Sequence, residues 1–131
     1  MTDGPVILVA DDECDIVRLA RRRLVRAGYT VVTAADGAEA LLEVERSHPQ
    51  LALLDVMMPK LTGIEVAQQL RTTAARHMPI VLMSAGLPHE LVLPRDADAF
   101  INKPFDLQQP QAVVESMLLG HHLEAVETRL G

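Results

Sequence analysis

Aromatic residues and cysteine are scarce in this chain of 131 residues. The aromatics are Tyr29, Phe100 and Phe105, and tryptophan is absent. The core must therefore be built from aliphatic side chains and methionine. The single cysteine, Cys14, excludes an intramolecular disulfide and a cysteine-rich zinc site. A chain of this length buries enough apolar surface to fold without either kind of cross-link.

Basic residues are outnumbered, with 12 Lys and Arg against 18 Asp and Glu, giving a net charge of −6. This balance argues against direct nucleic-acid binding, because neutralising phosphates requires a basic surface. Long hydrophobic runs are lacking too: the run at 6–10 is far too short for a signal peptide or a membrane span. We expect a cytoplasmic protein that contacts neither nucleic acid nor membrane.

The remaining composition is that of a globular protein, with 49% hydrophobic and 23% charged residues. The length predicts one domain. We place its core at about 5–119 and interpret 120–131 as an extension of the last helix or the start of a linker.

Four short apolar runs predict β-strands, and a weaker fifth run follows them. These segments are 6–10, 31–34, 51–54, 80–83 and 99–102. Several of the runs are continuously apolar rather than alternating, which is typical of strands buried on both faces of a parallel sheet.

Helical patterns separate the strands. They cover 14–27, 37–47 and 63–71, and a last helix begins near Pro110. A fourth helix between Pro88 and Pro94 should be short or irregular, because proline interrupts helices. Alternating strands and helices predict an α/β fold, a flavodoxin-like doubly wound sheet of five parallel strands in the order 2-1-3-4-5.

Acidic residues follow two strands that this order makes neighbours. Asp11 and Asp12 come after the first strand, and Asp55 comes after the third. Ligands bind at the carboxyl ends of such strands, where the strand order reverses. Crowded carboxylates repel one another unless a cation lies between them, and oxygen ligands with open positions suit Mg²⁺. We therefore predict a Mg²⁺ site, which Mn²⁺ could also fill.

The other two strands end in groups that suit a phosphoryl ligand. Ser84 follows the fourth strand and would donate a hydrogen bond, while Lys103 follows the fifth and would neutralise phosphoryl oxygens. Asp55, central among these groups, is the best candidate for a nucleophile that forms an aspartyl phosphate.

Together these motifs resemble those of response-regulator receiver domains of two-component systems. The matching segments, in the family's order, are 8–13 (LVADDE), 54–63 (LDVMMPKLTG), 84–85 (SA) and 100–105 (FINKPF). A pair of aspartates alone is a weak signal, but this combination is highly specific.

The resemblance implies a role for each site residue. Asp55 would take a phosphoryl group from a phosphohistidine and ligate Mg²⁺ with Asp12. Asp11 would help directly or through water, and the backbone carbonyl of Met57 would complete the ligand set. Further roles fall to Ser84 and Lys103 as phosphoryl contacts, Phe100 as an aromatic switch, Ala85 as the small residue that keeps the phosphoryl site open, and Pro104 after a bond that is often cis.

The resemblance also implies partners. The phosphodonor would be a sensor histidine kinase or a histidine phosphotransfer protein, and the output would pass to a downstream protein or to an output domain outside this sequence. In the family, the output face comprises the segment around Pro88–Pro94, the strand at 99–102 and the last helix, which makes it a candidate homodimer surface. The chain would be a phosphoacceptor rather than an enzyme, apart from its own phosphorylation and slow autodephosphorylation.

Two other functions remain open from the residues. The two-proline segment would suit a constitutive interaction module that has the fold but ignores phosphate. A phosphohydrolase acting through an aspartyl phosphate is the other alternative. Such enzymes commonly carry a second acid two residues after the nucleophile, where this chain has Met57, which cannot transfer protons.

Overall fold

The computed structural model describes residues 4–85, 96–103 and 108–119, without the side chains of 85, 102, 103 and 108–110. The strands and helices within these ranges alternate until the last two strands. They are β1 (Val6–Ala10), α1 (Cys14–Arg26), β2 (Thr30–Ala34), α2 (Gly37–Ser47), β3 (Leu51–Asp55), α3 (Gly63–Leu70), β4 (Ile80–Ala85), β5 (Ala99–Lys103) and α4 (Gln108–Leu118).

One parallel sheet forms the centre of the molecule, with strand order β2-β1-β3-β4-β5. This order confirms the predicted fold class. The strand order reverses between β1 and β3, where Ala10 pairs with Leu54. The residues that follow these two strands therefore lie next to each other at one edge of the sheet.

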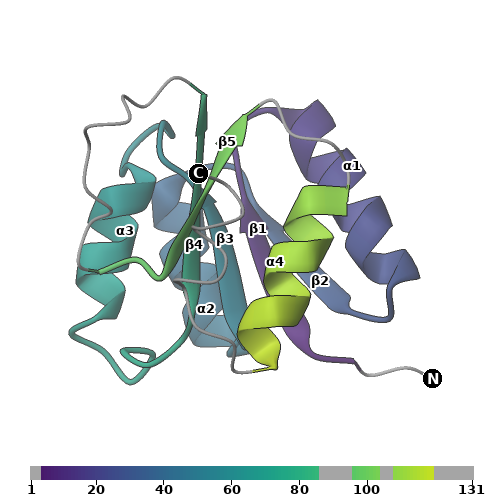
Figure 1. The fold of residues 1–131 in the computed structure, drawn as a ribbon. Helices are drawn as coiled ribbons and strands as arrows, with labels where there is room; N and C mark the ends of the chain where they lie inside the picture. Colours follow the sequence, from purple (N-terminus) through teal and green to yellow (C-terminus); the bar gives the residue numbers. More distant parts are fainter. Residues whose placement is uncertain (1–3, 86–95, 104–107, 120–131) are drawn as a thin grey trace.

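Helices cover both faces of the sheet (Figure 1). One core cluster contains sheet residues such as Leu8 and Leu54 packed against α2 and α3. The second contains Ile7 and Leu53 packed against α1 and α4. Successive strand residues thus point into different layers, which explains why the strands are apolar on both faces.

The predicted segments agree with these bounds to within two residues. β4 and α4 differ most: β4 continues to Ala85, and α4 begins at Gln108, which places Pro110 in its first turn as expected. The prediction for Pro88–Pro94 falls outside the described residues, as does that for 120–131. No helix in the described part of the chain is long and apolar enough to cross a membrane.

Candidate functional site: an acidic pocket at the carboxyl edge of the sheet

Three carboxylates meet where β1 and β3 end. Asp11 and Asp12 follow β1, and Asp55 is the last residue of β3. One oxygen from each of the three side chains lies within 4.8 Å of the others. The parallel register accounts for this meeting, because it aligns the ends of the two strands.

Two of these carboxylates are almost completely buried. Asp11 is 1% exposed and Asp55 is 4% exposed, whereas Asp12 is exposed at the pocket mouth. The Glu13 backbone N–H donates a 3.0 Å hydrogen bond to Oδ1 of Asp11. Such crowding of buried oxygens is unfavourable without positive charge nearby. The donor set, all oxygen and open to solvent on one side, fits a hard divalent cation such as Mg²⁺.

The loop after Asp55 is held by backbone hydrogen bonds. Val56 N–H donates to the Met83 carbonyl at 2.8 Å, and Gly63 N–H donates to the Val56 carbonyl at 3.0 Å. The Met57 side chain is 69% exposed, and within the described residues its carbonyl accepts no hydrogen bond. That carbonyl therefore keeps its capacity to bind a cation.

The part of this loop that leads into α3 is bonded to the start of α2. Gly37 N–H donates to the Pro59 carbonyl at 3.3 Å, and Lys60 Nζ lies 3.5 Å from Asp36 Oδ2. Asp36 caps α2 by accepting a hydrogen bond from Glu39 N–H at 2.8 Å. This backbone hydrogen bond is the main reason that the pKa of Asp36 is lowered, and Lys60 lowers it further.

The first residue of α3, Gly63, lies directly against the backbone of Asp55. A side chain at Gly63 would collide with the Asp55 carbonyl, so only glycine permits this close approach. Thr62 Oγ1 accepts from Glu65 N–H at 3.1 Å, and Glu65 Oε1 accepts from Thr62 N–H at 2.9 Å, forming a capping box.

The other predicted residues lie on β4 and β5. Ser84 is buried, and the register pairs the next residue, Ala85, with Lys103. Phe100 is half-buried against the cluster beneath α2 and α3. The side chains of Ala85 and Lys103 lie outside the described residues, as does all of Pro104, so their predicted roles stay predictions.

Sequence reasoning thus found the three carboxylates that the structure brings together, but it missed what fixes their surroundings. No structural role was predicted for Gly63, although it lies in the matching segment 54–63, and neither the Thr62–Glu65 capping box nor the Lys60–Asp36 pair was predicted. The capping box has a sequence signal, threonine followed three residues later by glutamate. The Lys60–Asp36 pair has no such signal, because its members are 24 residues apart (60 − 36).

Known proteins resemble this chain in sequence. The transcriptional regulatory protein PhoP for alkaline phosphatase synthesis in Bacillus subtilis is 41% identical over 127 residues, covering 95% of this chain and 52% of PhoP. Response regulator MprA of Mycobacterium leprae is 40% identical over 114 residues, covering 86% of this chain and 50% of MprA. The chain spans about half the length of the curated relatives it matches.

Solved structures resemble it in fold. The response regulator TrrA of Thermotoga maritima, in complex with Mg(2+)-BeF, superposes with a TM-score of 0.78 at 32% identity, covering 86% of this chain and 97% of TrrA. The family model described as the response regulator receiver domain matches residues 7–115. With its strand order and its acidic pocket, this chain belongs to the response regulator receiver domain family of two-component systems.

Proposed function

We propose that the acidic pocket makes this receiver domain a Mg²⁺-dependent phosphoacceptor, with Asp55 as the phosphorylated residue. The observation that carries the proposal is the meeting of Asp11, Asp12 and Asp55 within 4.8 Å. TrrA, a relative by fold, was solved with Mg(2+)-BeF, and this also supports the proposal. We take 5–119 as one receiver domain.

The cation site would be formed by side chains and one backbone group. Asp12 and Asp55 would be direct ligands, with Asp11 binding directly or through water and the Met57 carbonyl completing the protein's share. Mg²⁺, or Mn²⁺ in its place, would supply positive charge against the oxygens of the incoming phosphoryl group.

Asp55 would act as the nucleophile. One of its carboxylate oxygens attacks the phosphorus of a phosphohistidine, a P–O bond forms as the P–N bond breaks, and the imidazole leaves as the neutral ring after taking up a proton. Such a transfer needs positioning and charge neutralisation more than covalent chemistry. Buried Asp55, at the end of a rigid strand, provides the positioning.

Ser84, Lys103 and Phe100 would convert phosphorylation into a change of shape. Lys103 and Ser84 would bind phosphoryl oxygens across a site that Ala85 leaves open, and Phe100 would turn inward as Ser84 moves. If these contacts favour the active conformation by about 1–3 kcal/mol, its population relative to the inactive one rises roughly 5–150-fold.

The partners follow from the proposed chemistry. The donor would be a sensor histidine kinase or a phosphotransfer protein in the cytoplasm. Because several relatives of about twice this length are named transcriptional regulators, we propose that the signal passes to an output domain or a separate protein. Two copies would pair through the face that includes β5 and α4. Autodephosphorylation would be slow, because Met57 offers no proton-transfer group near Asp55.

The proposal is tested by phosphorylation with acetyl phosphate and Mg²⁺, read by intact-protein mass spectrometry. The wild type should gain one phosphoryl group, and Asp55→Asn should gain none. Asp15→Asn, a change of the same kind at an exposed position in the first turn of α1, should label like the wild type. Equal labelling of Asp55→Asn and the wild type would remove Asp55 from its role.

A second measurement isolates the cation site. Titration of the unphosphorylated wild type with Mg²⁺, followed by amide NMR, should shift the signals of 11–13 and 55–58. Asp12→Asn should weaken this binding by about tenfold or more, because it removes one anionic ligand. Unchanged Mg²⁺ affinity in Asp12→Asn would show that the exposed aspartate is no ligand.

A further inference from the structure

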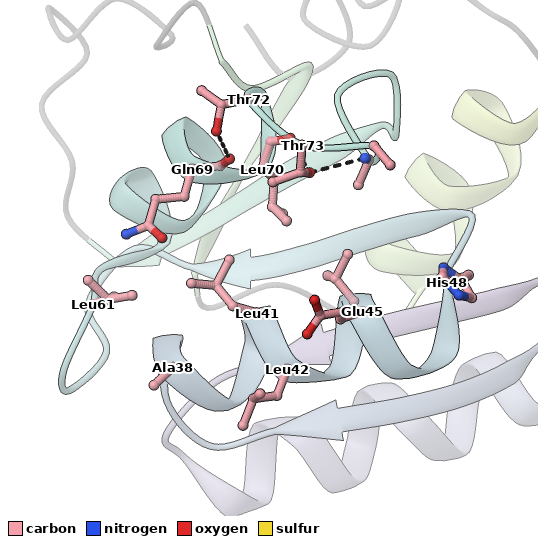
Figure 2. Close-up of a pocket in the computed structure, with 13 residues that line it drawn as sticks. Ala38, Leu41, Leu42, Glu45, His48, Leu61, Gln69, Leu70, Thr72 and Thr73 are labelled. Carbon is pink, nitrogen blue, oxygen red and sulfur yellow. Dashed lines mark hydrogen bonds between the residues drawn. The ribbon is translucent and has the colours of Figure 1, made fainter.

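A groove of about 700 Å³ runs between α2 and α3, on the face of the sheet that these helices cover. Figure 2 shows Leu41 on the α2 wall and Gln69 and Leu70 on the α3 wall. Leu61, in the loop after Asp55, lies at one end of the groove, and His48 lies at the other.

The groove is lined by apolar residues of α2 that the protein core covers only in part. The sheet-facing stripe of α2 consists of the buried residues Gly37, Ala40 and Val44. Ala38, Leu41 and Leu42 also line the groove, and Leu42 is 56% exposed. The lining from residue 38 to residue 48 spans about 15 Å of helix, or roughly three turns. This length matches a groove that holds a short helix rather than a single side chain.

The α2 wall also carries a negative charge, that of Glu45, which no cationic side chain among the described residues pairs with. Glu39 and Glu43 on the same helix are engaged, since Glu39 accepts from Ala35 N–H and Glu43 accepts from Arg46 and Ser47. Glu45 lines the groove, is exposed, and forms no hydrogen bond or ion pair with the described residues. A carboxylate beside the exposed Leu42 and the half-buried Leu41 favours an occupant that has both apolar and cationic side chains.

The α3 wall adds polar groups but no net charge. The Thr72 and Thr73 hydroxyls donate to the backbone carbonyls of Gln69 and Leu70 at 2.7 Å each, as Figure 2 shows for Thr72. Glu45 is therefore the sole acidic side chain that lines the groove among the described residues. Any charge selectivity of the groove should depend on it.

We propose that the α2–α3 groove binds a basic amphipathic helix of a partner protein. Leucine-sized side chains of that helix would pack against Leu41 and Leu42, and a lysine or arginine would pair with Glu45. The groove is separate from the carboxylates that hold the proposed phosphoacceptor site. Binding requires neither Mg²⁺ nor phosphate, so it can be tested even if the proposed phosphorylation fails.

The test is an NMR titration of the ¹⁵N-labelled full chain with a synthetic helical peptide of about 16 residues, with leucines on one face and lysines flanking them. A second peptide carries glutamate in place of every lysine. The lysine peptide should shift the amides of 38–48 and 69–75 and bind at least about tenfold more tightly than the glutamate peptide.

Two variants and their matched controls locate the binding. Leu42→Gln should weaken binding of the lysine peptide about tenfold, whereas Leu119→Gln, at an exposed leucine directly after α4, should not. Glu45→Lys should abolish the preference for the lysine peptide, whereas Glu115→Lys on α4 should preserve it. All four positions are exposed or partly exposed, so the fold should tolerate these changes.

Several results would overturn the proposal. Equal affinity for the two peptides would show that Glu45 selects nothing. Undiminished binding by Leu42→Gln, or amide shifts confined to α1 and α4, would place the peptide elsewhere. Sedimentation that showed two copies of the chain associating through this groove, with the peptide excluded, would identify a second copy as the occupant.

Discussion

The two helical layers that cover the sheet are held in different ways. The layer of α2 and α3 is fastened by polar bonds at its helix ends, including the Asp36 cap and the Thr62–Glu65 capping box. Both layers also pack on the sheet through apolar residues, such as Val66 of α3 and Leu24 of α1. The N-cap residue of α1 makes no side-chain capping bond.

The polar bonds of the α2 and α3 layer also act on one side of the acidic pocket. The loop after Asp55 leads into α3 and is bonded to the start of α2, so polar bonds in that layer also fix the loop. Apolar contacts are non-directional, whereas hydrogen bonds have preferred distances and angles. Hydrogen bonds at the ends of α2 and α3 are therefore better suited than apolar contacts to holding the loop after Asp55 in one conformation.

The largest expected effect comes from Arg71, just after α3. Its guanidinium donates to the carbonyls of Asp96 and Met78, at 2.9 and 2.7 Å, and to Asp98 Oδ2 at 2.8 Å. Asp98 Oδ2 also accepts from Ile80 N–H at 2.8 Å. Arg71→Met should lower the free energy of unfolding by about 2–4 kcal/mol, because it leaves several acceptors unpaired. Urea denaturation measures this loss.

The matched control for that prediction lies in the other layer. Arg22 on α1 is exposed and forms no ion pair within the described residues. Arg22→Met should change the free energy of unfolding by no more than about 0.5 kcal/mol. Comparable losses in both variants would show that the two layers depend equally on their arginines, and the contrast drawn above would be wrong.

A smaller effect is expected at the glycine behind the pocket. Gly63→Ala should cost about 1–3 kcal/mol, because the added methyl group collides with the Asp55 carbonyl and must displace α3 or the strand end. Mg²⁺ affinity should fall as well, because the displaced carbonyl belongs to Asp55, whose carboxylate is a proposed Mg²⁺ ligand.

Gly28, after α1, gives the comparison for Gly63. It has a φ of +102° but open space around its α-carbon. Gly28→Ala should cost about 1–2 kcal/mol through backbone strain and leave Mg²⁺ affinity unchanged. Urea denaturation and Mg²⁺ titration of both variants separate the two effects. Unaltered Mg²⁺ affinity in Gly63→Ala would mean that the position of α3 does not control the pocket.

Sequence reasoning reached the sheet and the carboxylates for the same physical reason. Continuous apolar runs such as Leu51–Leu54 indicate burial on both faces, and their alternation with helices predicts a doubly wound parallel sheet, for which the flavodoxin-like order is the natural candidate. Once that order is known, Asp11 and Asp55 must be neighbours. The contacts of Arg71 with Asp98 could not be found in this way, because they join residues 27 positions apart and no local sequence pattern predicts such a contact.

The capping box gives a prediction of intermediate size. Thr62→Ala should lower the free energy of unfolding by about 1 kcal/mol, because Glu65 N–H loses its acceptor at the first turn of α3. Thr62→Ser retains the hydroxyl and should recover most of the loss. Thermal or urea denaturation of the three proteins measures it. If Thr62→Ser were as unstable as Thr62→Ala, the methyl group and not the hydrogen bond would be stabilising the helix.

The smallest effect concerns pH and the α2 cap. The pKa of Asp36 is lowered from its ordinary value of 3.8, mainly because the carboxylate accepts the Glu39 N–H and also because Lys60 lies nearby. A depressed folded-state pKa adds stability above the unfolded-state pKa, and that stability is lost as the pH falls through the folded value. Asp36→Asn keeps a capping oxygen but cannot titrate. The wild type should therefore exceed Asp36→Asn in urea midpoint at about pH 6, and the difference should shrink below about pH 4. A difference that stayed constant over this range would show that the charge of Asp36 contributes nothing to stability, and that its contribution to capping α2 comes from the hydrogen bond alone.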